Sequence, residues 1–432
     1  MQIKKLKDCC TIIAGQSPES KYYNADGIGL PFFQGKADFG ELYPTIRVFC
    51  SQPTKTAEKD DILLSVRAPV GPTNLAPCKV CIGRGLTAIR PSEVLLTRYV
   101  LLFFRYFEAQ LASQGTGTTF KAITQDVVKN LEIPIPPIPE QKRIVARIEE
   151  LFSQLDAGVE TLKKTKAQLA IDRQAVLKEA FEGRLTAEWR EGHPDCSPLR
   201  DYETIVINAP IYKDTSGDEN EIHLTLPDKW IKLRMGDVFQ VEVGATPSRR
   251  VPEYWNGSIS WVSSGEVRFN HIYSTDERIT ELGLANASTN VQPIGTIMLA
   301  MIGEGKTRGQ AAILEIPAAH NQNTAAILVS STPCDPKYIY YFLQMNYENT
   351  RRVGSGNNQK ALNKERVRAL RFPFTSFEEQ HMIVEAIESR LSVCDSIEQT
   401  IDAILQQAEA MWQSILKDAF EGRLTDEQTN KS

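Results

Sequence analysis

The feature that most constrains the fold of this 432-residue chain is a long internal repeat. The first copy begins EQKRIVARIEELFSQLDAG at Glu140 and ends KEAFEGRLT at Thr186. The second begins EQHMIVEAIESRLSVCDSI at Glu379 and ends KDAFEGRLT at Thr425. The offset is 239 residues at both ends (379 − 140 and 425 − 186), so the copies align without a gap. A match of this kind indicates a duplicated architecture.

Both copies predict long helices. Apolar residues recur at spacings of three and four, as at Ile144 and Ile148 and again at Ile387 and Leu391, which is the period of one apolar stripe on a helix. About 42 residues at ~1.5 Å each give a rod of roughly 60 Å. A narrow stripe on such a rod must bury against another rod, so we predict an intramolecular antiparallel coiled coil. Two surface helices packed separately on two cores are the alternative.

The rest of the chain divides around these helices. Short apolar runs separated by turn residues predict an α/β fold, and Tyr99 to Leu111 predicts a helix. Gly183 and Gly422 stand where helix C-terminal caps are expected. The predicted organisation is globular domain 1–135, long helix 136–186, linker 187–225, globular domain 226–374 and long helix 375–427.

The two globular domains also correspond loosely to each other. GTIMLAMIG (295–303) matches DDILLSVRA (60–68), and GSGNNQKAL (354–362) matches GTGTTFKAI (115–123) at the same offset of 239. The frame positions match while the loop residues differ. We therefore predict two similar domains with a pseudo-twofold repeat, each reading a different target.

Composition narrows the cellular setting. No apolar run of 18 residues is present, so no membrane span is expected, and the N-terminal apolar run is too short for a signal peptide. Eight cysteines without framework spacing suggest reduced thiols in a cytoplasm, and the single CxxC pair at Cys78 and Cys81 does not predict zinc. The net charge of −5 hides a division: residues 1–132 carry 16 − 12 = +4, and residues 377–428 carry 3 − 12 = −9.

Motifs for catalysis are missing from the sequence. GEGKT at 303–307 resembles a phosphate-binding loop, but the further glycine that the motif needs is replaced by Ala300. No Asn/Asp-Pro-Pro-aromatic tetrapeptide of amino-methyltransferases occurs, and the five histidines have no triad or metal-site spacing. A non-catalytic binding protein without a metal or cofactor of its own is the prediction.

Gly-rich loops instead offer groups that suit DNA. Gln and Asn can read adenine, Arg and Lys guanine, and Glu can accept from cytosine, while glycine lets the backbone approach phosphate. The candidates in the first domain are Gln34, Lys36, Arg67, Arg84, Thr116, Thr118, Thr119 and Lys121. Those in the second domain are Ser263, Ser264, Glu266, Arg268, Lys306, Arg308, Gln322, Asn323, Asn357, Asn358, Gln359 and Lys360. Lys121 and Lys360 occupy matching positions in two different loops. A residue shared by both loops is expected to contact the DNA phosphate backbone rather than the bases.

Taken together, IPIPPIPEQKRIV, the long helix ending EAFEGRLT and the preceding GTGTTFKAI resemble the specificity subunit of type I restriction–modification systems. The resemblance extends over nearly the whole chain. The second copy departs from it, with FPFTSFEEQ in place of IPIPPIPEQ.

The resemblance implies a division of labour. Each domain would be a target-recognition domain reading one half of a bipartite double-stranded DNA target. The paired helices would space the half-sites and dock two methyltransferase subunits, together with restriction subunits. S-adenosylmethionine, ATP and Mg²⁺ would be bound by those partners.

Two other classes of function compete with this prediction. One is a coiled-coil scaffold or adaptor whose acidic helices bind other proteins. The other is a self-contained restriction–methylation enzyme, against which the missing methyltransferase motifs argue.

Overall fold

The computed structural model describes residues 2–114, 122–206, 224–303, 305–352 and 361–424. The chain forms two compact units. Unit 1 comprises residues 1–164 and 400–432, and unit 2 comprises residues 165–399. Each unit therefore contains one globular part and portions of both long helices.

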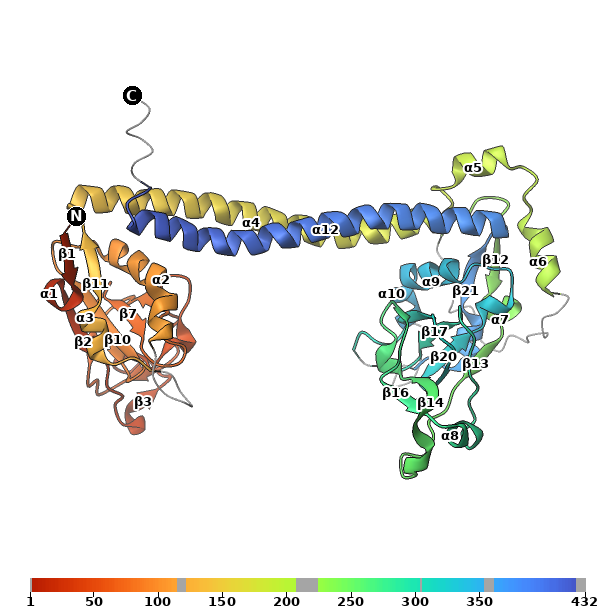
Figure 1. The fold of residues 1–432 in the computed structure, drawn as a ribbon, viewed down its shortest axis with the longest axis horizontal. Coiled ribbons are helices and arrows are strands. Elements are labelled where there is room, and N and C mark those ends of the chain that lie inside the picture. The colour runs from red at the N-terminus through yellow and green to blue at the C-terminus, as the bar shows by residue number, and fades with distance from the viewer. Residues whose placement is uncertain (1, 115–121, 207–223, 304, 353–360, 425–432) are drawn as a thin grey trace. The chain divides into compact units, whose positions relative to one another are not determined.

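Unit 1 is built on three antiparallel or mixed sheets (Figure 1). They have the strand orders β2-β10-β7-β8, β3-β5-β4-β9-β6 and β1-β11. The strands are β1 (Gln2–Lys5), β2 (Cys10–Ala14), β3 (Tyr23–Asn24), β4 (Leu30–Phe33), β5 (Phe49–Cys50), β6 (Thr56–Ala57), β7 (Ile62–Ser65), β8 (Thr73–Leu75), β9 (Val80–Ile82), β10 (Leu86–Pro91) and β11 (Glu132–Ile135). The helices are α1 (Leu6–Cys9), η1 (Ser20–Tyr22), η2 (Lys36–Asp38), α2 (Thr97–Ser113), α3 (Gln125–Asn130) and the first part of α4 (Ile138–Phe181).

Unit 2 repeats this plan with the strand orders β13-β20-β17-β18-β15, β16-β14-β19 and β12-β21. The strands are β12 (Ile231–Arg234), β13 (Val241–Val243), β14 (Trp255–Val262), β15 (Asn270–Ile272), β16 (Glu277–Ile279), β17 (Ile297–Ala300), β18 (Ala311–Leu314), β19 (Ala318–His320), β20 (Thr324–Ile327) and β21 (Arg371–Phe374). The helices are α5 (Ala187–Gly192), α6 (Pro198–Val206), α7 (Met235–Val238), η3 (Pro252–Tyr254), η4 (Ser264–Glu266), α8 (Glu281–Ala285), η5 (Val329–Ser331), α9 (Pro336–Met345), α10 (Tyr347–Arg352), α11 (Lys364–Ala369) and the first part of α12 (Phe377–Phe420).

One central strand in each unit buries both of its faces. In β7, Ile62 and Leu64 join the core under α2, while Leu63 points the other way, into a second core that contains Phe33. In unit 2, Ile297 and Leu299 of β17 join the core under α9, and Met298 and Ala300 face the opposite core. Side chains alternate along a strand, so two buried faces require an uninterrupted apolar run. This explains the matching ILLS and IMLA segments.

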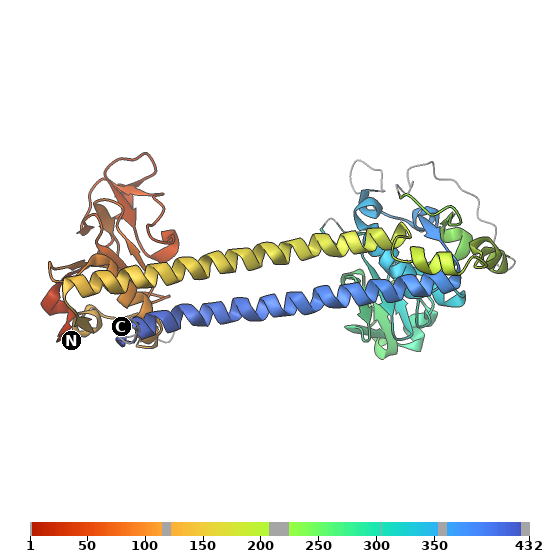
Figure 2. The ribbon, with the colours of Figure 1, turned by 90° about the horizontal axis from the view of Figure 1, so that it is seen from above.

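The two predicted long helices are present as α4 and α12, each of 44 residues. Within unit 2 they pair in opposite directions, because Lys166 and Arg173 of α4 both reach Glu398, while Glu179 reaches Arg390. Residue numbers thus fall along one helix as they rise along the other (Figure 2). In unit 1, Phe152 of α4 and Leu416 of α12 meet in one core. The antiparallel coiled coil is confirmed, and the alternative of separately packed helices is not.

Both long helices end at the glycines that the sequence predicted as caps. Gly183 has φ of +71° and Gly422 has φ of +83°, the left-handed conformation that glycine adopts without strain. The N–H of Arg184 bonds the carbonyl of Glu179 at 2.9 Å, and the N–H of Arg423 bonds that of Asp418 at 2.8 Å. These bonds satisfy the last turn of each helix.

The phenylalanine before each cap completes the core of a unit. Phe181, at the end of α4, contacts Tyr338 and Phe342 of α9 with ring centroids 5.1 and 5.5 Å away. Phe420, at the end of α12, contacts Tyr99 and Phe103 of α2 at 5.2 and 5.5 Å. All three pairs of matching residues differ by 239 in number (420 − 181, 338 − 99 and 342 − 103). Each helix therefore begins after one globular part and ends in the core of the other unit.

The glutamine of each EQ motif fixes the start of its helix. The buried amide of Gln141 accepts from the Leu96 N–H at 2.8 Å and donates to the carbonyls of Val94 and Pro136 at 2.8 and 2.9 Å. Gln380 makes the counterparts of two of these bonds, accepting from the Asp335 N–H at 3.3 Å and donating to the Thr375 carbonyl at 2.9 Å. This buried amide ties each long helix to the loop that precedes α2 or α9.

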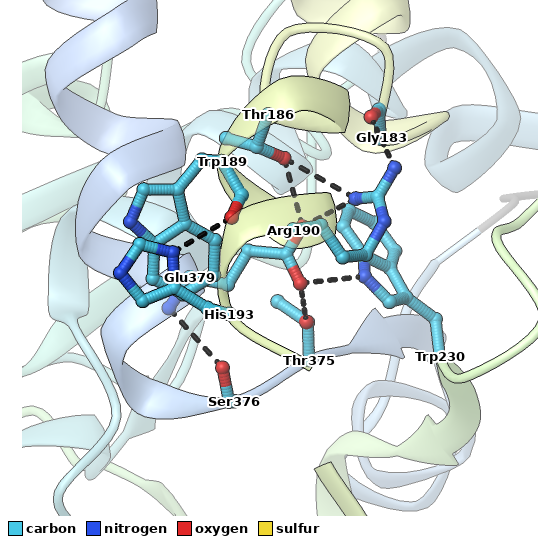
Figure 3. Close-up of polar contacts among 9 residues, drawn as sticks. All are labelled: Gly183, Thr186, Trp189, Arg190, His193, Trp230, Thr375, Ser376 and Glu379. Carbon is cyan, nitrogen blue, oxygen red and sulfur yellow. Dashed lines mark hydrogen bonds and ion pairs between the residues drawn. The ribbon is translucent and has the colours of Figure 1, made fainter. Parts of the chain in front are cut away.

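The neighbouring glutamate differs between the units. In unit 2, Glu379 is buried and accepts hydrogen bonds from Thr186 at 2.8 Å, the Trp230 indole at 2.9 Å, and from Thr375 and Arg190 (Figure 3). These partners come from the end of the first repeat, α5, the residue before β12 and the turn between β21 and α12. In unit 1, the matching Glu140 pairs with Arg143 on its own helix at 2.6 Å. Within the described residues, this buried polar cluster is found at the start of α12 and has no counterpart at the start of α4.

The segment that the sequence predicts as a linker contains two short helices, α5 and α6. Ile205 of α6 is buried in the main core of unit 2, and Tyr202 contacts Phe374 with ring centroids 6.1 Å apart. The side chain of Asp201 accepts from the Phe377 N–H at 3.0 Å, at the start of α12. These few apolar residues in a polar stretch order the segment by packing rather than by periodicity.

Candidate functional site

Backbone hydrogen bonds bring the predicted loops of unit 1 together. After the parallel strands β4 and β9, the Gly83 N–H bonds the Phe33 carbonyl at 2.8 Å, and the Gly85 N–H bonds the Gln34 carbonyl at 3.1 Å. The Val66 N–H bonds the Gly85 carbonyl, and the Ile123 N–H bonds the Val66 carbonyl, both at 3.0 Å. Four segments distant in sequence therefore lie side by side. We call this row the loop edge of unit 1.

The predicted residues stand at the tips of these segments. Gln34, Arg84 and Arg67 are all exposed, on the first, second and third segments of the row. Lys36 is exposed in η2, two residues beyond Gln34. The second segment is closely packed at its base, because a Cβ on Gly85 would lie 2.4 Å from the Gln34 carbonyl oxygen. The backbone is thus held on both sides, while the side chains at the tips face solvent.

Unit 2 has a matching row, joined by the counterparts of three of these four hydrogen bonds. The Asn321 N–H bonds the Val262 carbonyl at 3.0 Å, after the parallel strands β14 and β19. The Met301 N–H bonds the Asn323 carbonyl at 2.8 Å, and the Leu362 N–H bonds the Met301 carbonyl at 3.0 Å. This is the loop edge of unit 2. Position by position, Gln34 corresponds to Ser263, Arg84 to Gln322, and Arg67 to Ile302.

A hydroxyl supports the second segment in both units. Ser17 Oγ accepts from the Arg84 N–H at 3.2 Å, and Thr246 Oγ1 donates to Gln322 Oε1 at 2.5 Å. Both hydroxyls follow matching glycines, Gly15 and Gly244. Sequence reasoning missed Ser17, Thr246 and Ile302. The Gly-x-x-Pro motif that recurs after a strand could have indicated Ser17 and Thr246, which lie within it. The 41% exposure of Ile302 can be seen only in the structure.

The remaining predicted residues of unit 2 lie on two neighbouring turns. Glu266 accepts from the backbone N–H of Ser263 at 2.7 Å and of Asp276 at 3.0 Å, so its carboxylate caps η4. Arg268 is exposed and donates to the Gly265 carbonyl, and Ser264 is half-buried in η4. Lys306 is exposed, whereas Arg308 donates to the Arg351 carbonyl at 2.9 Å. Asn323 is half-buried beside Gln322.

A buried histidine lies directly under the loop edge of unit 2. His320 ends β19, and its Nδ1 is 2.9 Å from Thr324 Oγ1. Burial lowers the pKa of His320 to about 4, because the charged imidazolium would lose its hydration. Its Nε2 is buried without a hydrogen-bond partner within the part of the chain that the structure describes. The side chain is therefore a neutral support for the turn at Gln322.

Eight predicted residues lie outside the described residues, and their contacts remain predictions. They are Thr116, Thr118, Thr119, Lys121, Asn357, Asn358, Gln359 and Lys360. The segments that follow them, at Ile123 and Leu362, take the fourth place in each loop edge.

The described residues show neither a metal-binding cluster nor a membrane-spanning helix. Among them, no three His, Cys, Asp or Glu side chains are grouped as a metal ion would require. Cys81 lies in β9, where burial raises the pKa of its thiol to about 11. In the ranges that the structure describes, no helix has the length and apolar character needed to cross a bilayer.

Comparison with known proteins agrees with this architecture. The family model of the type I restriction modification DNA specificity domain matches residues 1–170 and 227–407. The chain therefore belongs to the type I restriction–modification DNA specificity family, which confirms the resemblance drawn from its repeats.

Several relatives are specificity subunits. The chain is 38% identical over 175 residues to the putative type I restriction enzyme MjaX specificity subunit of Methanocaldococcus jannaschii, an alignment that spans only 40% of either protein. It is 24% identical over 349 residues to the EcoBI specificity subunit of Escherichia coli, covering 77% of this chain and 68% of the relative.

Solved structures share the fold at low sequence identity. A chain from a study of complex assembly and conformational transition of the type I R-M system has a TM-score of 0.68 at 16% identity, with 98% of each chain covered. The HsdS subunit from Thermoanaerobacter tengcongensis has a TM-score of 0.59 at 16% identity, with 98% of this chain and 97% of that chain covered. The predicted fold class, two α/β domains with two long antiparallel helices, is confirmed.

Proposed function

We propose that this chain is the non-catalytic DNA-recognition subunit of a type I restriction–modification complex. Each unit reads one half of a bipartite double-stranded target with its loop edge. Family membership supports DNA target recognition, and the arrangement into two half-sites is our inference from the duplicated units.

The observation that carries the proposal is the repeated loop edge. The backbone rows of the two units match, yet their first three tips are Gln34, Arg84 and Arg67 in unit 1 and Ser263, Gln322 and Ile302 in unit 2. A common frame with different residues at its tips suits two readers of different sequences, since base edges are distinguished by side-chain donors, acceptors and apolar groups.

The long helices are proposed to dock methyltransferase subunits, with restriction subunits joining that complex. Four exposed apolar residues of α12 support this: Val393, Ile397, Ile404 and Met411. Their spacings of four, seven and seven residues place them on one side of a helix with 3.6 residues per turn. They flank the buried seam of α12, so a partner helix can cover them. S-adenosylmethionine, ATP and Mg²⁺ are assigned to the partner subunits.

The primary test is adenine methylation mapping in a host that expresses this chain with its methyltransferase subunit. The expected result is one motif with two specific parts separated by unspecified bases. A gel shift with duplexes carrying the mapped motif should show binding by the assembled complex. Absence of any chain-dependent motif, or a motif in one continuous part, would overturn the proposal.

Docking is tested by substitution on the exposed face of α12. Ile397→Glu with Ile404→Glu should reduce co-purification of the methyltransferase subunit, because two charges would be buried at the contact. Gln406→Glu is the matched control, since Gln406 is exposed on another side of the same helix. Equal co-purification of the double variant and the control would exclude this face as the dock.

The continuous helices are also proposed to set the gap between half-sites. Inserting four residues near Ala167 adds one helical turn, about 6 Å, while keeping the apolar stripe nearly in phase. At ~3.4 Å per base pair, the mapped gap should grow by one or two base pairs with both half-sites unchanged. An unchanged gap with methylation intact would mean that another feature sets the spacing.

A further inference from the structure

The turn in the second segment of each loop edge has the same construction and a different tip. In unit 1 the turn runs from Gly83 to Leu86 and is closed by a bond from the Leu86 N–H to the Gly83 carbonyl at 3.0 Å. In unit 2 it runs from Asn321 to Thr324 and is closed by the matching bond at 3.3 Å. Arg84 and Gln322 occupy the same place in their turns, and both side chains are exposed.

This turn is held from two sides by the row. Its first residue is bonded to the first segment, and its third residue is bonded to the third segment, in both units. In unit 1, Gly83 and Gly85 are buried and Arg84 between them is exposed. In unit 2, Asn321 is 7% exposed, Asn323 is half-buried and Gln322 between them is exposed. A side chain on a backbone fixed from two sides presents its polar atoms in a defined direction, as base recognition needs.

We infer that Arg84 and Gln322 are equivalent base-reading positions, and that they give the two half-sites different preferences. Arg84 is suited to the O6 and N7 atoms of guanine, because its guanidinium donates two parallel hydrogen bonds. Gln322 is suited to the N6 and N7 atoms of adenine, because its amide both donates and accepts. The inference rests on the proposed function and adds to it the base that each position reads.

The supporting hydroxyls fit these different tasks. Ser17 accepts from the backbone N–H of Arg84 and so engages none of the guanidinium donors of its side chain. Thr246 donates to Gln322 Oε1, which orients the amide and still leaves that oxygen a second lone pair for the adenine N6–H. The amide group is therefore preset in one orientation before DNA is bound.

The test begins with the wild-type motif from methylation mapping, and uses the full chain assembled with its methyltransferase subunit. Binding is then measured on duplexes with each motif position changed in turn, for Arg84→Gln, Arg84→Lys and Gln322→Arg. Arg84→Gln should lose about 5- to 150-fold of discrimination at one guanine, the range of a bidentate contact. The other half-site should be read as before. Gln322→Arg should weaken preference for one adenine in the other half-site only.

The lysine variant separates base reading from phosphate contact. Arg84→Lys keeps the charge but loses the planar fork, so discrimination at the guanine should fall while the salt dependence of binding stays nearly constant. The inference is overturned if Arg84→Gln weakens binding to all duplexes equally, if Arg84→Lys behaves as wild type, or if either turn variant alters both half-sites. The wild-type motif is mapped first. If the wild type has no bipartite motif, the proposed function itself fails. If the motif is bipartite but the variants do not behave as expected, only the assignment of Arg84 and Gln322 fails.

Discussion

At the scale of single residues, two buried amides connect the sequence repeat to the fold. Gln141 and Gln380 make matching hydrogen bonds to the loops before α2 and α9. The EQ motif was recognised as the start of a helix, but its partners could not be predicted. They lie about 45 residues earlier in the chain, and only the folded core brings them within reach.

Gln141→Ala should lower the free energy of unfolding by on the order of 3 kcal/mol. The substitution leaves the Leu96 N–H and the carbonyls of Val94 and Pro136 without the amide, and unsatisfied buried groups each cost about 1–3 kcal/mol. Denaturant unfolding of the full chain measures the change. Lys142→Ala, at the next and exposed residue, is the control, and equal stability of both variants would contradict the role of the amide.

His320 gives a prediction for pH dependence. Its folded-state pKa of about 4 lies below the ordinary value of 6.5, so the unfolded chain binds a proton first as the pH falls. The contribution of this pKa difference to the free energy of unfolding is fully present above pH 6.5 and is lost as the pH falls towards 4. The loss is on the order of 3 kcal/mol. His320→Leu should flatten this part of the plot of unfolding free energy against pH. The control, His381→Leu at an exposed position, keeps His320 and should keep the slope. Equally steep profiles for wild type and His320→Leu would refute it.

Residue identity alone did not reveal which tips correspond. The offset between the units changes along the chain, from 229 at Gly15 and Gly244 through 235 at Val66 and Met301 to 239 at Ile123 and Leu362. Arg84 and Gln322 were both predicted as candidates, yet they differ by 238, so the constant offset of the helices does not align them. Their equivalence follows from backbone hydrogen bonds that span loops of different length.

At the scale of elements, periodicity predicted the helices better than the sheets. The long apolar stripes of α4 and α12 and the apolar run of α2 are local signals. Strands such as β5 and β6 have only two residues each, and their pairing depends on distant partners. The order within the sheets therefore could not be read from local pattern.

Phe420→Ala should destabilise unit 1 selectively, by about 3–5 kcal/mol, because it leaves a cavity against Tyr99 and Phe103. Hydrogen exchange should then show faster opening of α2 than of α9. Phe181→Ala should give the reverse pattern, and Met411→Ala, exposed on the same helix as Phe420, should give neither. Uniform loosening of α2 and α9 in both phenylalanine variants would contradict the separate cores.

At the scale of the whole molecule, modularity is the testable consequence of duplication. Replacing residues 1–132 with the matching part of a relative should change one half of the methylated motif and preserve the other. The reason is that each loop edge is formed entirely within its own unit. Methylation mapping measures the outcome, and replacement of residues 231–371 is the reciprocal control. Simultaneous change of both halves would contradict independent reading.

The reciprocal placement of Phe181 and Phe420 gives the chain the connectivity that a domain-swapped dimer of a single repeat would have. Each half of the sequence supplies a globular part with an incomplete core and a helix whose last turn completes a core of the same design. A swap between identical copies would close in the same way, with twofold symmetry and two identical loop edges. The fused duplication removes that identity, and thereby frees one recognition surface to diverge from the other.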